Sequence, residues 1–297
     1  MNGYLGNDGL VNLSLVGVVS RICGVIPIDY LAIGHITQDI VSTDRVTGGT
    51  VAYAGRTAAV LGCKTAVFSS ASSDFEWQTA LPNITVHTTP SPTTTTFENI
   101  YTDDGRIQYL HQRAQPLTAA TIPLHWQRPF IVHFAPVANE IEGDMIPLFG
   151  NSLIGMTPQG WLRQWDKNGR IAYRPWEAAT QLLPLAGAVI LSEEDLPDTN
   201  LLTHYRSLSQ LLVLTQGENG CTVYTPSESR HIPAPSVTAV ESTGAGDVFA
   251  AAFLVRLWQT EGNVWEAAHF ANKLAAQSVT QVGLPAKMDS IKKVLRK

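Results

Sequence analysis

Residues 242–258 read Ser242-Thr-Gly-Ala-Gly-Asp247, followed by Val248-Phe-Ala-Ala-Ala-Phe-Leu-Val-Arg-Leu-Trp258. The second part is dense in strong helix formers, so we expect an apolar helix that begins at a Gly-Ala-Gly turn. The free N–H groups and the positive dipole end of a helix start attract anions, and small residues let a phosphate approach the backbone. The stretch therefore predicts an anion-binding turn made of Gly244, Ala245 and Gly246.

Asp247 falls in the first turn of this expected helix. A carboxylate there can simply stabilise the helix start, by about 0.3 to 1 kcal/mol. It can also take a proton from an attacking hydroxyl while the neighbouring amides stabilise charge on a transferred phosphoryl group. The turn alone leaves both roles open.

Upstream of the turn, short apolar runs alternate with helical ones. Residues 29–34 form an apolar run that ends in glycine, which suits a buried strand, and Gly48-Gly49 opens an Ala-rich helix over residues 50–62. Further strands are expected at residues 64–70, 129–135, 152–156, 188–192 and 211–215, and a helix at residues 176–185. This alternation predicts an α/β fold with a mainly parallel sheet covered by helices.

Residues 84–111 break the alternation. They are rich in Thr, Val, Ile, Tyr and Phe, with a turn at Asp103-Asp104-Gly105, and predict an antiparallel hairpin set apart from the main sheet. Because residues 93–97 could face a cleft, the hairpin could close over a ligand as a lid. An ordinary edge hairpin fits the pattern equally well.

The composition favours a soluble globular protein. The chain has 297 residues, of which 44% are hydrophobic and 15% charged, which excludes collagen-like, coiled-coil and disordered chains. The formal net charge is -5, and the basic residues of the tail at 292–297 are interpreted as a solvated helix end. We therefore expect neither nucleic acid nor membrane as a partner.

The three cysteines, Cys23, Cys63 and Cys221, are odd in number and have no CxxC spacing. They predict neither a disulfide framework nor a cysteine zinc site, and they favour a reducing, cytoplasmic compartment. The histidines show no HxxxH or HExxH spacing, and the chain has no GxSxG elbow and no GxxxxGK[ST] loop. Residues 1–27, whose apolar part is interrupted by polar residues, are interpreted as an N-terminal extension or a misplaced start, with a targeting segment as the less favoured alternative.

Several segments together resemble the pfkB, or ribokinase-like, carbohydrate kinases. Residues 242–258 resemble the C-terminal signature of that family, and Gly48-Gly49 with its helix resembles the N-terminal glycine motif. Further similarities are Gly34 with Asp39, residues 214–220 (a TxGxxG turn) and residues 268–283. The resemblance implies a ribokinase-like three-layer sandwich over residues 28–297, with a small β lid whose strands lie near residues 35–47 and 84–113.

The resemblance also implies roles for individual residues. Asp247 would be the catalytic base, with Gly244, Ala245 and Gly246 as the anion hole for the γ-phosphate of ATP. Substrate hydroxyls would be held by Asp39, Gly48 and Gly49. The nucleotide site would be lined by Thr215, Gly217 and Gly220, with Asn272 and Ser278 near the adenine. Mg²⁺ would sit mainly among phosphates and waters, and a requirement for a monovalent cation stays open.

Other positions depart from the family pattern. Glu241 stands where Asp or Asn is usual, Tyr53 stands for Asn, and Ser192-Glu-Glu-Asp195 stands for Asn-x-x-Glu. Asp195 could still order a metal-bound water. Residues 157–163 resemble a DPxxxxR segment in which Thr157 replaces the acid. Its Gln159 and Arg163 could reach substrate or phosphate, or could belong to a surface loop.

The predicted activity is ATP-dependent phosphorylation of a hydroxyl on a sugar or polyol, with inositol-like acceptors among the candidates. Alternatives are a nucleoside kinase, or a catalytically weak homologue that binds a sugar or nucleotide, which Ser192 and Glu241 motivate. Pairing of lids would give a homodimer, and a monomer fits equally well.

Overall fold

The computed structural model describes residues 28–102 and 105–296. The expected N-terminal extension at residues 1–27, and Asp103-Asp104 of the expected turn, lie outside the described residues. Every described helix is too short or too polar to cross a membrane.

The central sheet has nine strands in the order β15-β14-β13-β12-β9-β8-β1-β4-β5. Neighbours from β13 to β5 pair in parallel, whereas β14 and β15 are antiparallel. The strands are β1 (Tyr30–Ile33), β4 (Thr65–Ala71), β5 (Thr85–Pro90), β8 (Ile131–Phe134), β9 (Leu153–Met156), β12 (Ala188–Ser192), β13 (Leu212–Thr215), β14 (Cys221–Tyr224) and β15 (Ser229–Ile232). The mainly parallel α/β sheet predicted from the alternating pattern is confirmed.

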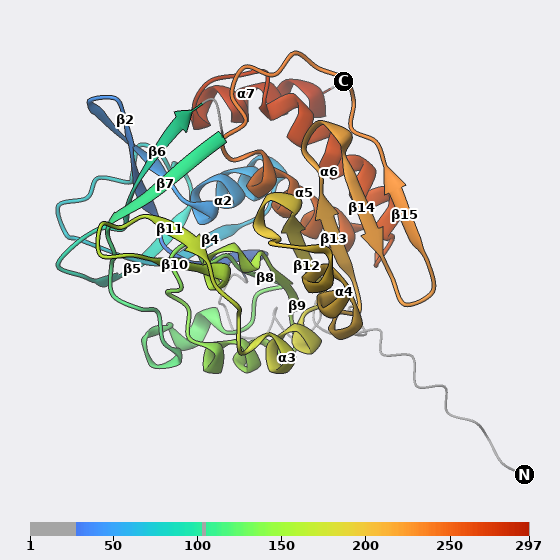
Figure 1. Cartoon of the computed structure of the whole chain (residues 1–297), viewed down its shortest axis with the longest axis horizontal. Coiled ribbons are helices and arrows are strands. Elements are labelled where there is room, and N and C mark those ends of the chain that lie inside the picture. Colours follow the sequence, from blue (N-terminus) through green and yellow to red (C-terminus); the bar gives the residue numbers. More distant parts are fainter. Residues whose placement is uncertain (1–27, 103–104, 297) are drawn as a thin grey trace, which may run out of the picture.

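Helices cover both faces of this sheet (Figure 1). One face carries α2 (Thr50–Val60), α5 (Ala245–Gln259), α6 (Val264–Ser278) and α7 (Leu284–Leu295), whose apolar side chains share one buried cluster. The other face carries α3 (Ala179–Leu182), α4 (Thr199–Leu208) and 3₁₀ turns such as η4 (Gly143–Phe149) over a second cluster. The expected three-layer arrangement is therefore confirmed.

The long α5 lies close against the sheet because its neighbour on β9 is a glycine. A Cβ on Gly155 would come within 2.3 Å of the Leu254 side chain. This packing fixes the height of α5 above the strands, and with it the position of the turn at its N-terminus.

The helix expected at residues 176–185 is shorter than predicted. Only Ala179–Leu182 is α-helical, and Leu183–Leu185 follows as the 3₁₀ turn η6. Pro184 explains why the α-helix ends early, because proline lacks the N–H that an α-helix would use at this position and its ring clashes with the preceding turn.

A second, smaller sheet stands to one side of the main one (Figure 1). Its order is β3-β2-β6-β7, from β2 (Thr37–Val41), β3 (Asp44–Gly48), β6 (Thr96–Thr102) and β7 (Gly105–Gln112). Beside β7 lies the short hairpin of β10 (Arg163–Trp165) and β11 (Ile171–Tyr173), joined to it by a bridge between Tyr109 and Arg170. We call the four-stranded sheet of β3, β2, β6 and β7 the side sheet.

The prediction that residues 84–111 form one hairpin is wrong for their first part. Thr85–Pro90 pairs in parallel with β4 and forms the edge of the main sheet, so only β6 and β7 make the hairpin. A Thr- and Val-rich segment has the same β propensity at a sheet edge as in a separate hairpin. Its composition therefore did not distinguish the two places.

Candidate active site

The candidate site lies at the carboxyl edge of the parallel strands, where ligands of open α/β sheets bind. The segments that follow β1, β9 and β12 reach this edge, and the N-termini of α2 and α5 point to it. Residues from each of these segments contact or electrostatically influence Asp247 or its neighbours.

The turn before α5 has the conformation expected of an anion-binding helix start. Gly244 is the N-cap with φ 77°, a left-handed conformation that favours glycine. The N–H of Ala245 donates to the carbonyl of Ser242 (3.0 Å), which closes the turn. A Cβ on Gly246 would meet no atom within 4 Å, so open space lies in front of the helix start.

The Tyr53 side chain packs against the turn before α5. A Cβ on Gly244 would lie 2.2 Å from the Tyr53 ring, so the ring of α2 packs directly on the backbone of the turn. Tyr53 is the residue that replaces the Asn of the glycine motif, and its side chain is buried. The departure therefore has a structural use: an aromatic ring fixes the turn against α2.

Asp247 has a carboxyl group whose pKa is strongly raised. Burial of the group raises its pKa to about 6, and the negative charges of Asp39 and Asp195 raise it further. A hydrogen bond from Thr50 and the positive charge of Arg163 act in the opposite direction. Thr50 is the first residue of α2, directly after Gly49, so the two glycine turns meet at this carboxylate.

Asp39 comes to the site from the side sheet. Its Oδ1 accepts a hydrogen bond from the Thr37 hydroxyl (2.8 Å). A Cβ on Gly48 would lie 2.1 Å from its Oδ2, so only glycine leaves room for the carboxylate there. Gly49, with φ 88°, similarly lies against the carbonyl of His35. The structure thus brings together Asp39, Gly48 and Gly49, as the resemblance implied.

Gln159 and Arg163 belong to this cluster. The Gln159 amide donates to Oδ1 of Asp195 (3.1 Å), and the Arg163 guanidinium influences the pKa values of both Asp195 and Asp247. Arg163 also donates to the carbonyl of Val137 (3.0 Å) and lies 5.8 Å from the centre of the Phe97 ring of the side sheet. The surface-loop interpretation of these two residues does not fit this arrangement. We call Asp39, Asp195, Asp247 and Arg163 the charged cluster.

Sequence reasoning missed a buried carboxylate, Glu140, which is linked to this cluster through Val137. Glu140 is fully buried and accepts hydrogen bonds from the backbone N–H groups of His35, Val137 and Ala138, at 2.7 to 3.0 Å. It therefore ties the loop after β1 to the loop after β8. The second loop also supplies the carbonyl that Arg163 binds.

Replacing Glu140 with glutamine should destabilise the protein by about 2 to 4 kcal/mol, because hydrogen bonds to a buried charge are strong and an amide NH₂ would face backbone donors. Urea unfolding of the variant and wild type measures the difference. Glu142→Gln, at an exposed position nearby, should change stability little. Equal midpoints for the Glu140 variant and wild type would contradict this role.

A buried polar chain that sequence reasoning also missed leads to Thr157. The Tyr30 hydroxyl lies 2.6 Å from Nδ1 of His133, and Nε2 of His133 lies 3.0 Å from the Thr157 hydroxyl. Burial lowers the pKa of His133 to about 3, so its ring is neutral. If Tyr30 donates to Nδ1, the ring proton is on Nε2 and Thr157 accepts it, which leaves the Thr157 proton free to donate elsewhere.

The residues expected near a nucleotide fall into two groups. Thr215, Gly217 and Gly220 lie at the turn from β13 into η8 (Gly217–Asn219), and a Cβ on Gly217 would meet no atom within 4 Å. In contrast, the amide of Asn272 donates to the backbone carbonyl of Ile232 (2.9 Å), and the hydroxyl of Ser278 donates to the backbone carbonyl of Ala275 (2.7 Å). Both side chains are buried, so any contact of these two residues with an adenine would come from their backbone.

The described residues contain no group of three or more His, Cys, Asp and Glu arranged to hold a metal. Asp195, the residue expected to order a metal-bound water, is held by Gln159, and burial raises its pKa. A single carboxylate of this kind fits a Mg²⁺ that is bound mainly by phosphate and water.

Comparison with known proteins identifies the chain's relationship. Residues 185–290 match the family model of the pfkB family carbohydrate kinases. This part of the chain is similar to that family. The matched residues include the turn before α5 and Asp247, which the geometry above places beside the charged cluster.

Two curated relatives illustrate the extent of the similarity. Inositol 3-kinase of Oryza sativa subsp. japonica is 26% identical over 93% of this chain and 75% of its own length. Probable fructokinase-5 of Arabidopsis thaliana is 44% identical over 84 residues, which are 26% of this chain and 26% of the relative. The chain thus matches only about a quarter of the fructokinase.

Solved structures show that the chain has a ribokinase-like fold. A pyrophosphate-dependent kinase of the ribokinase family, in complex with a pyrophosphate analogue and myo-inositol, has a TM-score of 0.76 at 24% identity, covering 89% of this chain and 99% of its own. A fructokinase from Vibrio cholerae O395, bound to fructose, ADP and a potassium ion, has a TM-score of 0.70 at 20% identity, covering 89% and 96%. At such identities the likeness concerns the fold.

Proposed function

We propose that this chain is an ATP-dependent kinase that transfers the γ-phosphate to a hydroxyl group of a sugar or polyol. The observation that carries the proposal is the position of Asp247. This carboxylate lies in the first turn of α5, beside the open space at Gly246, and shares the charged cluster with Asp39 of the side sheet.

In the proposed reaction, Asp39 and the backbone at Gly48 hold the acceptor so that one hydroxyl faces Asp247. Asp247 takes the proton of that hydroxyl as the oxygen forms its bond to the γ-phosphorus, and the bond between this phosphorus and the ADP oxygen breaks. The amides at the start of α5 stabilise the charge on the transferred group. The products are ADP and a phosphate ester.

The charge balance of the cluster supports Mg²⁺ as the companion of the donor. Three carboxylates face one guanidinium, which leaves excess negative charge when all three are ionised. Donor phosphates would be repelled by this charge unless a divalent cation came with them. Asp195 is the residue that we propose for a metal-bound water.

An apolar surface beside the turn supports a nucleotide over bare pyrophosphate as the donor. Val240 and Val282 are 62% and 64% exposed. A hydrogen bond from the Gly283 N–H to Glu241 Oε2 (2.8 Å) brings their two chain segments together. A purine could cover exposed apolar side chains such as these, whereas pyrophosphate could not.

The side sheet is proposed as the lid of the site. Asp39 on β2 is paired with Phe97 on β6, whose ring lies near Arg163. The same sheet therefore carries a proposed substrate ligand and the apolar residue above the guanidinium. Closure of such a sheet over the acceptor would exclude water and limit hydrolysis of ATP.

A donor and acceptor screen tests the proposed function. Purified protein is incubated with Mg²⁺ and either ATP or pyrophosphate, over a panel of inositols, hexoses, pentoses and nucleosides, and phosphorylated product is detected by mass spectrometry. We expect product from ATP with a sugar or polyol. If product formed with pyrophosphate but not with ATP, pyrophosphate would be the donor. If only nucleosides were phosphorylated, the acceptor would be a nucleoside. ATP binding without any product would favour the catalytically weak homologue.

The proposed base also predicts the pH dependence of the reaction. Because the pKa of Asp247 is raised to about 6, kcat/KM should fall about tenfold for each pH unit below that value and be level above it. A pH series with the identified acceptor measures this limb. Arg163 lowers the pKa of Asp247, so Arg163→Gln should shift the limb to higher pH, and a limb unmoved in this variant would contradict the assignment.

A further inference from the structure

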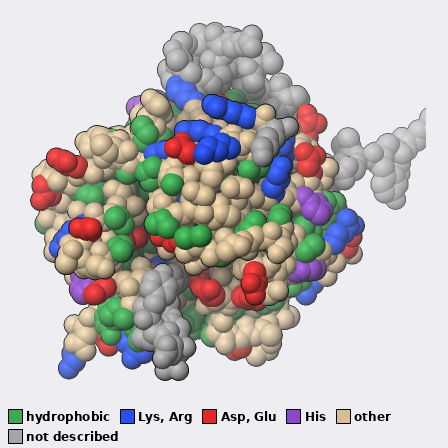
Figure 2. Space-filling model, turned by 90° about the horizontal axis from the view of Figure 1, so that it is seen from above, with side chains coloured by type: hydrophobic (Ala, Val, Ile, Leu, Met, Phe, Trp, Pro, Cys, Tyr) green, Lys and Arg blue, Asp and Glu red, His purple; other side chains and the backbone are tan. Residues whose placement is uncertain are grey.

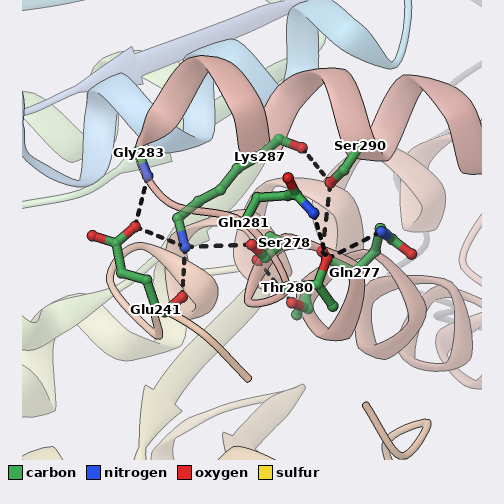
Figure 3. Close-up of polar contacts among 9 residues, drawn as sticks. Glu241, Gln277, Ser278, Thr280, Gln281, Gly283, Lys287 and Ser290 are labelled. Carbon is green, nitrogen blue, oxygen red and sulfur yellow. Dashed lines mark hydrogen bonds and ion pairs between the residues drawn. The ribbon is translucent and has the colours of Figure 1, made fainter. Parts of the chain in front are cut away.

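Lys287 is fully buried, although it carries a charged group. Its ammonium nitrogen lies 2.6 Å from the carbonyl oxygen of Glu241, 3.3 Å from the carbonyl oxygen of Ser278 and 3.2 Å from Oε2 of Glu241 (Figure 3). An ammonium group has three N–H donors. Three oxygens, one of them from a carboxylate, surround the ammonium group of Lys287, so each donor has one acceptor.

These oxygens are of the type that a dissolved cation takes. Carboxylate and backbone carbonyl oxygens replace the water shell of hard cations, and rings of carbonyls do so for potassium. Ser278 is also the last residue of α6, where the negative end of the helix dipole attracts positive charge. Without a cation among them, the three oxygens would repel one another.

The oxygens are also joined directly to the proposed anion hole. Glu241 is the residue before the stretch Ser242-Thr-Gly-Ala-Gly-Asp247. The N–H groups of Val240 and Glu241 both donate to the carbonyl of Val279, just after α6. Oε2 of Glu241 also accepts from the N–H of Gly283, next to the N-terminus of α7 (Figure 3). One group of contacts thus fixes the start of the turn to two helices.

We propose that the ammonium group of Lys287 is a built-in cation that holds the turn before α5 in place of a dissolved monovalent cation. The position that such an ion would need among these oxygens is taken by Nζ, so the open expectation of a monovalent cation does not fit this cage. Glu241 follows from the same arrangement, because its longer side chain reaches both Lys287 and the N–H of Gly283. Burial lowers the pKa of Lys287, and Glu241 opposes that shift, in keeping with a charge held by its partner.

Two substitutions of Lys287 test the proposal, because both remove the charge but only one leaves a void among the three oxygens. Lys287→Ala removes the charge and leaves a void that a potassium ion and water can enter. Lys287→Met removes the charge but fills the space. Lys292→Ala, on the same helix with a half-exposed side chain in a surface ion pair, is the matched control. Melting temperatures are measured with potassium chloride against tetramethylammonium chloride at constant ionic strength, and activity with ATP and the acceptor is measured in parallel.

We expect wild type and Lys292→Ala to behave alike in both salts. Lys287→Ala should lose at least about tenfold in activity in tetramethylammonium, and potassium should raise its melting temperature and restore much of that activity. Lys287→Met should lose activity that potassium does not restore. A wild type that needs potassium, or an alanine variant fully active without it, would overturn the proposal.

The activity measurement rests on the proposed function, whereas the melting temperature does not. The two measurements therefore test this inference and the proposed function separately. Should no acceptor be found, the melting temperatures still decide: a potassium-dependent rise in Lys287→Ala alone supports the built-in cation, and a rise in wild type contradicts it. If Lys287→Ala does not fold, a potassium-dependent rise in the melting temperature of wild type or of Lys287→Met would still contradict the proposal.

Discussion

Replacing Asp247 with asparagine should lower turnover by about 10²- to 10⁴-fold while leaving ATP binding nearly unchanged, as loss of a general base does. Asparagine keeps the shape of the side chain and can still interact with the Thr50 hydroxyl, so the turn should stay in place. The amide cannot accept the proton of the acceptor hydroxyl. Turnover is measured with the acceptor found in the screen, and ATP binding by calorimetry.

The same substitution has a distinctive effect on stability. The folded pKa of Asp247 is about 6, above its ordinary 3.8, so the folded state binds the proton more tightly than the unfolded one. Ionisation of Asp247 therefore costs stability as pH rises through this window. Asp247→Asn should match wild type in stability below the window and exceed it above. A residue that only stabilised the helix start would show the opposite difference at neutral pH.

Asp144→Asn serves as the matched control, because Asp144 is exposed and lies in η4 on the other face of the sheet. It should leave turnover and the pH profile of stability unchanged. Near-normal turnover of Asp247→Asn would remove this carboxylate from the mechanism, whatever its effect on stability.

Much of the fold could be predicted because the signals are local. Strand β1 is an unbroken apolar run buried on both faces, the pattern typical of a parallel strand covered by helices. The start of α5 is marked by small residues whose conformations the turn requires. The edge strand β5 could not be placed, because its pairing depends on β4 and not on its own composition.

The candidate site was predictable where one residue type suits one purpose. The fold brings Asp39, Gly48 and Asp247 close together, and their residue types are those that the proposed chemistry needs. Glu140 and Lys287 gave no such signal, since a charged residue is usually exposed. Only the folded chain supplies the N–H groups around Glu140 and the oxygens around Lys287.

The charge distribution over the surface does not mark the candidate site. On the face seen in Figure 2, acidic and basic side chains lie among apolar and uncharged ones, and several Lys and Arg side chains gather in its upper part. The electrostatics relevant to the proposed reaction are instead local, in the excess of carboxylates over Arg163 at the strand ends.

Gly246→Val should abolish most of the activity, by about 10²-fold or more, without lowering stability. A Cβ at this position meets no atom within 4 Å, so the folded chain has room for the side chain. Valine is also no worse than glycine inside a helix. The branched side chain would fill the space where the phosphate must approach the amides, and loss of such donors costs about 10²- to 10³-fold.

The neighbouring glycine shows why position 246 gives the cleaner test. At Gly244 a side chain would meet the Tyr53 ring at 2.2 Å and a positive φ, so a substitution there would disturb the turn itself. Gly150→Val is the matched control, since φ is -58° and the nearest atom to a Cβ is 3.8 Å away. It lies on the other face of the sheet and should keep full activity. A fully active Gly246→Val would mean that no phosphate approaches the start of α5, and the proposed role of Asp247 beside it would lose its reaction partner.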